Sequence, residues 1–423
     1  MPFVAPFKGL RYNPKKVASL QEVVTPPYDV ISPEGQARYY KRHPWNFVRV
    51  VFGKGLPSDT RTKNHYSRAR QTLAQWLDSR ILVMDPKPSI YPYLQEYASR
   101  GRRFRRLGVI ALVRLDSPKI FPHEGTREEP KKDRLELLKA VQASLSPIFG
   151  LIPDSRGSYT AFIKRLIARK KALAAFGLDG VGHRLWKVSD LKAIEQFEKL
   201  LGSKELVIAD GHHRYEAACA YRQWRRTRDP RFSLSAPYNY AMFYLMATSG
   251  LEEPGLLPTH RVVHRLSLAK LHRLLEDLKS QGLLRRVPSV TQLADHLEVL
   301  RQKKQLAVGL YSGNGASHLL MAPLSVSHEL DVEWLHGELF PSLSVDPLQV
   351  SYTQDLSLGM KQLARRAAQA LFIVQRPRLG EVLRRARAGS RMPGKTTFFY
   401  PKPLAGLVEY KFPGPMSANT GTG

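Results

Sequence analysis

Apolar residues follow two different spacings along the chain. In some segments they alternate with polar residues or form short continuous runs, which is typical of strands. In others they recur every three to four positions, which is typical of amphipathic helices. Because the two kinds of segment are interspersed without an internal repeat, the pattern predicts an α+β fold. Strands are expected at residues 47–52, 107–115, 206–210, 240–246, 306–311 and 318–321, and helices at 66–82, 130–144, 161–176, 215–226, 266–281 and 290–302.

One stretch, residues 152–158, is rich in residues that break helices and strands. Such a cluster favours a linker, so we expect an N-terminal α+β region over residues 1–155 and a core region over residues 156–262. A C-terminal α+β region is expected over residues 263–412. The small, polar and glycine-rich residues 413–423 predict a disordered tail.

The segment from residue 206 to residue 214 has the pattern of a strand, a sharp turn and a helix start. An apolar run ends at Asp210, and Gly211 permits both a tight turn and a close ligand approach that a side chain would block. A helix start presents backbone N–H groups and the positive end of the helix dipole. Gly211, His212 and His213 are therefore predicted to bind phosphate through their N–H groups, with Arg214 adding a charged fork.

A carboxylate beside a phosphate cradle is electrostatically unfavourable for binding alone. Asp210 is therefore predicted to be the base for a substrate hydroxyl or a magnesium ligand. In the alternative without chemistry, Asp210 caps the helix while the two histidines pack or face solvent. A cage of metal-binding side chains is not expected, because the adjacent residues His212 and His213 diverge by about 100° around a helix.

A second group of polar residues, His123, Glu124 and Thr126, precedes a predicted helix. An imidazole, an acid and a hydroxyl in this position could orient a polar substrate or hold magnesium, and His123 and Glu124 would then complete the catalytic pocket. The alternative is a loop that caps the helix. Arg134, within that helix, is either a second phosphate clamp or an ion-pair partner.

Two further segments combine polar groups in predicted loops. His260 and Arg261 follow Thr259, and Tyr28 precedes Asp29. His260 and Arg261 are therefore additional site candidates, although sequence alone does not bring either segment to the site.

Residues 389–396 satisfy the phosphate-loop pattern GxxxxGK followed by Ser or Thr. A working phosphate loop follows a buried strand and opens a helix. Here residues 382–388 are an arginine-rich helical stretch, whereas residues 397–400 are β-prone and precede Pro401. We therefore expect no Walker loop, and Lys395 is kept as a candidate phosphate contact on its own.

Charge changes this picture only in part. The chain of 423 residues has 66 lysines and arginines against 36 aspartates and glutamates, which gives a formal charge of +30. A strongly positive surface attracts nucleic acid. The basic clusters are scattered, however, and no RRM-type aromatic box, zinc finger or low-complexity arm accompanies them. We expect an arginine-rich solvated surface with generic affinity for polyanions.

The single cysteine, Cys219, excludes an internal disulfide and a cysteine-based zinc cage, and its alanine-rich surroundings predict buried packing. No stretch approaches the roughly 18 uninterrupted apolar residues of a membrane span. The first six residues are too short and too rich in proline for a signal peptide. A cytoplasmic protein without membrane contact is expected.

The segment from Ala209 to Glu216, Ala-Asp-Gly-His-His-Arg-Tyr-Glu, resembles the hallmark of the domain-of-unknown-function 1015 family. Other segments similar to that family follow in order almost from end to end of the chain. They are residues 26–30, 43–44 with 46–47, 123–124 with 126, 133–134, 146–149, 258–261, and 392–393 with 395–402. The family name itself asserts no function.

The Asp-Gly-His-His-Arg turn also resembles the phosphate-binding element of ParB/sulfiredoxin-like folds, including archaeal kinases that phosphorylate free serine. The resemblance implies a ParB/sulfiredoxin-like mixed α/β core around this turn, with additional α+β elements. It further implies that Asp210 serves the reacting hydroxyl while His212, His213 and Arg214 hold phosphate. Those kinases use a further glutamate, for which Glu124 is the candidate.

Together these features predict a phosphotransferase. It would move a phosphoryl group from ATP, ADP or pyrophosphate, with magnesium bound through Asp210 or Glu124, to the hydroxyl of a small metabolite. Free L-serine is the first candidate. Two alternatives stay open: a nucleotide-regulated, ParB-like nucleic-acid-binding protein, and a phosphate-ester hydrolase that uses water as the acceptor.

Overall fold

The chain passes four times between two units. The structure is a computed structural model that describes residues 3–99, 101–230, 232–250 and 255–413. Unit 1 comprises Met1–Pro122, Thr126–Glu253 and Pro401–Gly423, and unit 2 comprises His123–Gly125 and Pro254–Tyr400. Most of the tail predicted to be disordered, from residue 414 onward, lies outside the described residues.

Unit 1 is built on a mixed nine-stranded sheet in the order β6-β11-β8-β12-β5-β4-β10-β9, with β1 also paired to β5. The central strand β12 is antiparallel to β5 and parallel to β8. Because β8 and β12 are apolar and buried along their whole length, they form the core of the sheet. The strands are β1 (Val4–Ala5), β4 (Tyr91–Ser99), β5 (Arg102–Arg114), β6 (Ile120–Pro122), β8 (Ile148–Ile152), β9 (Ala174–Leu178), β10 (Val181–Leu185), β11 (Leu206–Asp210) and β12 (Tyr240–Ala247).

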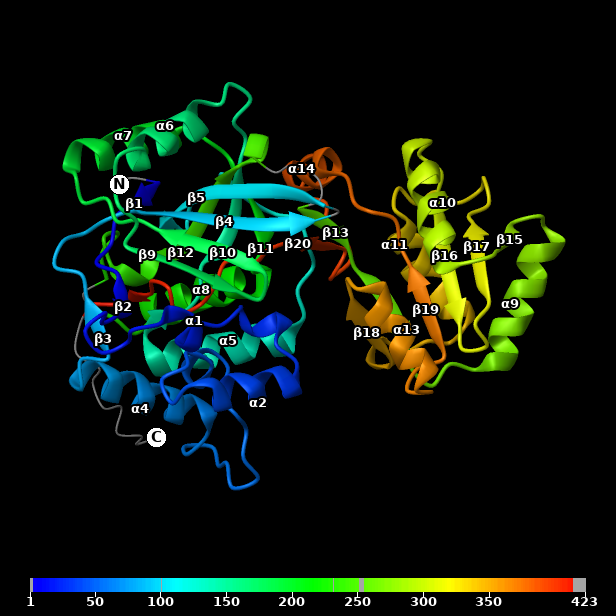
Figure 1. The fold of residues 1–423 in the computed structure, drawn as a ribbon, viewed down its shortest axis with the longest axis horizontal. Coiled ribbons are helices and arrows are strands. Elements are labelled where there is room, and N and C mark those ends of the chain that lie inside the picture. Colours follow the sequence, from blue (N-terminus) through cyan, green and yellow to red (C-terminus); the bar gives the residue numbers. More distant parts are fainter. Residues whose placement is uncertain (1–2, 100, 231, 251–254, 414–423) are drawn as a thin grey trace. The chain divides into compact units, whose positions relative to one another are not determined.

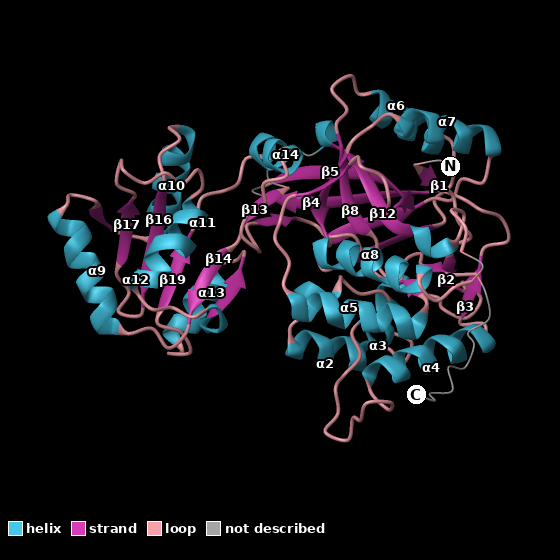
Figure 2. Cartoon of the chain, turned by 180° about the vertical axis from the view of Figure 1, so that it is seen from behind, coloured by secondary structure: helices cyan, strands magenta, loops and turns pink. Residues whose placement is uncertain are grey.

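Helices cover both faces of this sheet (Figures 1 and 2). On one face lie α6 (Ser158–Ile167) and α7 (Leu191–Gly202). On the other face α8 (His212–Arg226) packs against the sheet, and α5 (Glu128–Val141) packs on α8. A further layer beyond α5 contains α2 (Pro33–Arg42), α3 (Val48–Val51) and α4 (His65–Asp78).

Short elements complete unit 1. One small sheet pairs β2 (Leu10–Tyr12) with β3 (Leu82–Met84), and another pairs β7 (Ala143–Ser144) with β21 (Tyr410–Lys411). The second pairing ties the C-terminal segment into unit 1. The short helices are α1 (Leu20–Val23), η1 (Tyr28–Val30), η2 (Pro237–Asn239) and η3 (Thr248–Gly250).

The spacing of apolar residues explains why the covering helices pack as they do. In α7, the buried residues are Ile194, Phe197 and Leu201, which lie on one face of a helix. They pack with Tyr159 and Phe162 of α6 in the main hydrophobic core. The helix begins at Asp190, whose carboxylate accepts a hydrogen bond from Ala193 N at 2.8 Å.

Unit 2 contains an antiparallel six-stranded sheet in the order β15-β17-β16-β19-β14-β18. A separate pair joins β13 (Leu256–Pro258) to β20 (Thr397–Phe399). The sheet strands are β14 (His260–Val263), β15 (Leu284–Val287), β16 (Ala307–Ser312), β17 (Ser317–Met321), β18 (Val350–Thr353) and β19 (Ala370–Ile373). The helices are α9 (Leu268–Ser280), α10 (Val290–Gln302), α11 (Asp331–Trp334), the π-helical η4 (Leu335–Leu339), α12 (Phe340–Ser342), η5 (Pro347–Gln349), α13 (Leu356–Ala364) and α14 (Leu379–Arg387).

The predicted mixture of helices and strands is confirmed, including the hairpin of β16 and β17 and the elements β5, α4, α5, α9, α10, β11 and β12. The strands of unit 1 form a large mixed sheet. The predicted linker at residues 152–158 lies inside unit 1, where it joins β8 to α6. None of the helices in the described ranges has the length and apolar character that crossing a bilayer requires.

The prediction of a strand at residues 47–52 was wrong. This segment contains the short helix α3, and Phe47, Val48, Val50 and Val51 are all buried. The side chain of Asn46, just before the N-cap residue Phe47, accepts a hydrogen bond from Val48 N at 3.0 Å. Tertiary burial on all sides therefore overrides the strand preference of the valines.

The helix predicted for residues 161–176 ends earlier, at Ile167, and residues 174–176 belong to β9. A hairpin joins β9 to β10 through Asp179 and Gly180, both with positive φ (48° and 78°). An Asp-Gly pair with this conformation is the preferred two-residue hairpin turn. The Asp179-Gly180 pair is a hairpin signal that the sequence contains, but it lies beyond residues 161–176, the segment that was predicted to be helical.

Candidate active site

The turn between β11 and α8 has the predicted conformation. Gly211, the N-cap residue of α8, has φ +89°, a left-handed conformation that side chains disfavour. A Cβ atom at this position would lie 2.9 Å from the guanidinium carbon of Arg214. Glycine is therefore required here both by the backbone and by the arginine that packs beneath the turn.

Replacing Gly211 by alanine is expected to destabilise unit 1. The left-handed conformation alone costs a non-glycine residue about 1–2 kcal/mol, and displacement of Arg214 adds to this cost. Gly157 is the matched control because it has φ +65° at the start of α6 and open space around it. Gly157→Ala should lose only the backbone contribution in urea unfolding, so equal losses in the two variants would contradict the close packing at Arg214.

Asp210, at the end of β11, is held by two cations. Its Oδ2 accepts a hydrogen bond from Arg214 at 2.6 Å, and its Oδ1 lies 2.6 Å from Nζ of Lys402. Arg214 also donates to Oγ of Ser146 at 3.3 Å and to the carbonyl of Pro147. Since Arg214 is buried and bonded in this way, its geometry orients Asp210, and its predicted contact with phosphate stays a prediction.

Lys402 bridges two carboxylates. Its Nζ lies 2.5 Å from Oδ2 of Asp29 and 2.6 Å from Oδ1 of Asp210, and its side chain is only 6% exposed. Burial by itself would lower the pKa of Lys402, but the two carboxylates outweigh burial and raise it above its usual value. Lys402 is therefore a fixed positive charge at neutral pH.

Backbone contacts in unit 1 fix the position of Lys402. The carbonyl of Lys402 accepts a hydrogen bond from Nε2 of Gln95 in β4 at 3.0 Å. The carbonyl of the preceding Pro401 accepts one from the buried Arg106 in β5 at 2.7 Å. The C-terminal segment is thus anchored on the central strands before it reaches the two aspartates.

Tyr28 and Asp29 form part of η1, which follows Pro26 and Pro27. The guanidinium carbon of Arg134 lies 3.9 Å from the centre of the Tyr28 ring. Burial raises the pKa of Tyr28 to about 12, although the charges of Arg134 and Arg214 oppose the change. Tyr28 therefore stays neutral at physiological pH.

Arg134 forms an ion pair within unit 1, which was one of the two roles considered for it. It is buried, its Nε donates to Oδ2 of Asp133 at 2.8 Å, and its Nη1 donates to the carbonyl of Val51 at 2.8 Å. Tyr66 donates to the other oxygen of Asp133 at 2.7 Å. These bonds make Arg134 an ion-pair partner and leave its role as a phosphate clamp as a prediction.

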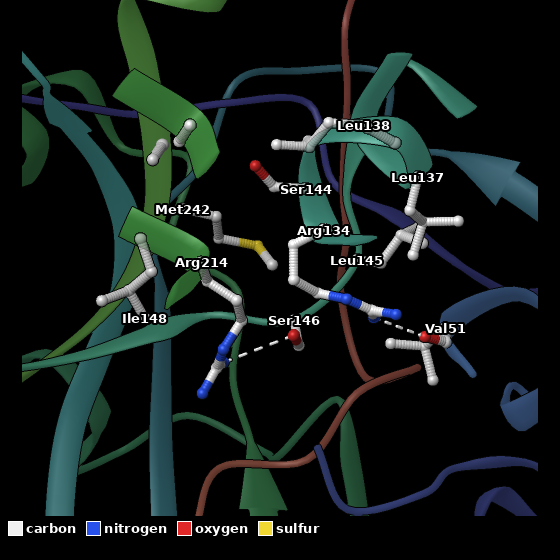
Figure 3. A pocket seen from close by; sticks show the side chains of 13 residues that line it. Val51, Arg134, Leu137, Leu138, Ser144, Leu145, Ser146, Ile148, Arg214 and Met242 are labelled. Atoms are coloured by element: carbon white, nitrogen blue, oxygen red, sulfur yellow. Dashed lines mark hydrogen bonds between the residues drawn. The ribbon is translucent and has the colours of Figure 1, made fainter. Parts of the chain in front are cut away.

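Arg134 and Arg214 both line a small cavity beside α5 and α8 (Figure 3). Its volume is about 50 Å³ and most of its walls are apolar, among them Leu137, Leu145 and Met242. A water molecule needs roughly 10–15 Å³ of such space. The cavity is therefore large enough for a few waters and too small for a nucleotide.

Thr126 and Arg127 contact residues in the first turns of α8. Oγ1 of Thr126 donates to the carboxylate of Glu216, and Arg127 N donates to Nε2 of His213 at 3.1 Å. His212 is buried. Within unit 1, the structure thus brings Thr126 to the predicted phosphate-binding helix start.

His123 and Glu124 belong to unit 2, whereas Asp210 belongs to unit 1. Oε1 of Glu124 accepts hydrogen bonds from Thr397 N at 3.0 Å and Thr397 Oγ1 at 2.9 Å. Nε2 of His123 lies 2.9 Å from the same hydroxyl. Within unit 2 these two side chains fix the start of β20, and their convergence on Asp210 stays a prediction.

Lys395 lies in the loop between α14 and β20. A helix precedes the phosphate-loop look-alike and a strand follows it, which is the reverse of the required order. The expectation that this segment has no Walker-loop context is confirmed. A phosphate contact of Lys395 on its own stays a prediction.

His260 and Arg261 lie on β14, and both are buried in unit 2. Nε of Arg261 donates to Nε2 of His336 at 3.1 Å, and Val374 N donates to Nδ1 of His260 at 3.3 Å. Burial, followed by the charge of Arg261, lowers the pKa of His260 to about 3 and that of His336 to about 4. In the folded protein these rings are therefore neutral parts of a core cluster, and their place in the active site stays a prediction.

This burial predicts a pH effect. Below about pH 6.5 the unfolded chain protonates the ring of His260, whereas the folded chain does so only near pH 3, so acidification through that window favours unfolding. The variant His260→Gln has no ring to protonate at this position. The difference in free energy of unfolding between the wild type and this variant should therefore shrink as the pH falls from 6.5 towards 3. Urea unfolding across this range measures it, with the exposed His272 of α9 changed to glutamine as the control. A difference that is constant with pH would contradict a buried neutral ring.

Two residues of the site, Asp29 and Lys402, were not predicted to contribute chemistry. Both fall in segments that resemble the family, and Asp29 was noted only as a polar loop residue. The described residues contain no group of three or more His, Cys, Asp or Glu that could hold a metal ion. Cys219, which was predicted to be buried, is only partly buried and packs against the main core, where burial raises the pKa of the thiol to about 11.

Comparison with known protein families identifies a family whose description gives no function. The model described as "Protein of unknown function (DUF1015)" matches residues 4–335. No curated protein matches the chain.

Several solved structures resemble the chain at low sequence identity. A conserved hypothetical protein from Pyrococcus furiosus is 16% identical over 68% of this chain and 89% of that chain, with a TM-score of 0.35. A free serine kinase in complex with AMP is 15% identical over 72% of this chain and 91% of that chain, with a TM-score of 0.37. SbnI with a C-terminal truncation, from Staphylococcus aureus, is 14% identical over 70% and 85%, with a TM-score of 0.37. TM-scores below 0.5 do not establish a shared activity.

Proposed function

The chain belongs to the DUF1015 family, and we propose that it transfers a phosphoryl group from a nucleotide or pyrophosphate to the hydroxyl of a small metabolite. Free L-serine is the first acceptor to test. The observation that supports this function is the pair of carboxylates, Asp29 and Asp210, joined by the ammonium of Lys402 at the start of α8. We also retain the ParB/sulfiredoxin-like arrangement of the core around residues 210–214, which the sequence resemblance implies.

The helix start binds the phosphoryl group that is transferred. The backbone N–H groups of Gly211, His212 and His213 begin α8, where the dipole favours an anion. No side chain of the N-cap residue competes with the phosphate, because that residue is glycine. Arg214 acts from behind the turn as a positioning residue, since its guanidinium contacts Asp210, Ser146 and Pro147.

Asp210 accepts the proton of the substrate hydroxyl. The hydroxyl oxygen forms a bond to the terminal phosphorus of the donor while the bond between that phosphorus and the leaving oxygen breaks, and the proton moves to the carboxylate. Lys402 and Arg214 fix the direction in which this carboxylate points. Lys402 also places positive charge where the transferred group carries negative charge.

Magnesium is the ion that usually accompanies a nucleotide, and it is held by phosphate oxygens, waters and one or two carboxylates. Asp210 fits this role poorly, because its two oxygens already face Lys402 and Arg214 at 2.6 Å. Glu124 has one oxygen engaged by Thr397. No step of the proposed reaction therefore needs a protein-bound magnesium ion, and His123 and Glu124 remain candidate pocket residues.

The test is an assay of the whole chain by phosphorus NMR. The protein is incubated with serine, magnesium and, in separate samples, ATP, ADP or pyrophosphate, and phosphoserine is expected with at least one donor. Omission of magnesium, with EDTA added, measures the requirement for the ion. Free phosphate as the only product would indicate ester or anhydride hydrolysis instead. No product with any donor and a panel of small hydroxyl metabolites would overturn the proposal.

A further inference from the structure

Unit 2 contains a cavity of about 520 Å³ that the proposed reaction does not use. It lies among the end of α10, the segment before α11, the loop after β19 and the start of α14. Its walls carry five cationic residues and three carboxylates. The cations are Arg301, Lys304, Arg376, Arg378 and Arg384, and the carboxylates are Glu329, Asp331 and Glu381.

The carboxylates are already engaged by protein groups. Glu329 pairs with Arg384 at 2.7 Å and with Arg385 at 2.9 Å. Asp331 is buried, and its two oxygens accept hydrogen bonds from Val332 N at 2.8 Å and Gln375 N at 2.5 Å. Burial raises the pKa of Asp331 to about 7, so a large fraction of this group is uncharged at neutral pH. Glu329 and Glu381 therefore offset the charges of Arg384 and Arg385, whereas Lys304 and Arg378 are not paired with any of these three acids.

Several cations remain to face a ligand. Lys304 is exposed and has no ion-pair partner in the part of the chain that the structure describes. Arg378 is anchored by a hydrogen bond to the carbonyl of Arg301 and is also the N-cap residue of α14. The start of this helix adds the positive end of its dipole to the cavity. Fixed arginines next to a helix start favour an anion with several acceptor oxygens.

We propose that this cavity is a second anion site, which binds a compact molecule carrying two or more linked phosphate groups. Such a ligand has enough charge to engage Lys304, Arg376 and Arg378 together, and the cavity has room for it. No residue to which the proposed reaction assigns a role lines this cavity: Asp29, Asp210 and Lys402 belong to unit 1, and His123 and Glu124 of unit 2 are not among its lining residues.

Calorimetric titration of the whole chain with inorganic tripolyphosphate tests the site. The double variant Lys304→Gln with Arg376→Gln should bind this probe about tenfold or more weakly, because two charge-assisted contacts are lost. A nucleoside triphosphate in a second series shows whether a nucleoside is accepted as well. Circular dichroism and thermal melting establish that the variant is folded.

Two other variants separate this site from bulk charge and from the active site. Arg165→Gln with Lys170→Gln removes the same charge from a groove lined by α6 and α7 in unit 1, and it should change the affinity less than twofold. An equal loss in this control would assign the binding to overall charge and overturn the proposal. Loss of all binding in a Lys402→Met protein that circular dichroism shows to be folded, with no loss of affinity in the unit 2 variant, would place the phosphate site in unit 1 and would overturn the proposal too. These binding measurements do not depend on phosphoryl transfer, so they test the cavity even if the phosphotransfer assay shows no product.

Discussion

Replacing Lys402 by methionine is expected to destabilise unit 1 by about 3–5 kcal/mol, the usual cost of removing one partner from a buried ion pair. Methionine keeps most of the apolar stem but removes the ammonium that lies 2.5 Å from Asp29 and 2.6 Å from Asp210. The two carboxylates then face each other in a site where each is less than one fifth exposed. Like charges that share a poorly solvated site repel strongly.

Urea unfolding followed by tryptophan fluorescence measures this loss. Of the five tryptophans, only Trp334 lies in unit 2, so the signal reports mainly on unit 1. Adding Asp29→Asn to Lys402→Met should recover part of the stability, because one of the two unpaired charges is removed, and a coupling of about 0.5–3 kcal/mol is typical of residues in contact. Lys192→Met, at an exposed position of α7, is the control and should change stability by less than about 0.5 kcal/mol. Additive effects of the two substitutions would contradict the bridge.

The sequence predicted those elements whose pattern is local. The strand, turn and helix around Gly211 follow from an apolar run, a glycine and an amphipathic segment, and all three are where they were expected. The short helix α3 was missed because its conformation is decided by burial on all sides and by the side chain of Asn46. Local preference favours a strand for three valines, and no local signal reports tertiary burial.

The site was predicted only where its residues are adjacent in the chain. Asp210 to Arg214 form one turn, and their chemistry can be read from that turn. Lys402 and Asp29 are 373 residues apart, and nothing in the composition of either segment shows that they meet. Arg214 illustrates a different limit, because an arginine after a phosphate-binding turn can point towards the ligand or back under the turn. Contacts with Ser146 and Pro147 give its direction here.

The order of the chain explains why His123 and Glu124 could not be assigned from the sequence. They are close in sequence to Thr126, which contacts Glu216 at the start of α8. Three residues, His123–Gly125, nevertheless belong to unit 2, where they pair with the segment before β20. A run of polar residues in one loop was therefore divided between two units, and a sequence pattern cannot show such a division.

Replacing Asp210 by asparagine should lower the rate of phosphoryl transfer by about 10²–10⁴-fold, the range for loss of a general base. Asparagine has nearly the same shape and can still accept one hydrogen bond, from Lys402 or from Arg214, so the turn should persist. The rate with the preferred donor and serine is measured by phosphorus NMR, and circular dichroism verifies the fold. Glu195→Gln on the exposed face of α7 removes one negative charge elsewhere and should retain full activity.

The same assay on Asp29→Asn distinguishes the two carboxylates that share Lys402. If Asp210 is the base, Asp29→Asn should retain more activity than Asp210→Asn, because Asp29 then acts only by holding the ammonium in place. If Asp29→Asn retains less activity than Asp210→Asn, the general base is Asp29, on the other side of Lys402. A folded Asp210→Asn protein with more than about one tenth of the wild-type rate would be incompatible with general-base catalysis by this residue, since even the lower end of the expected loss is about a hundredfold.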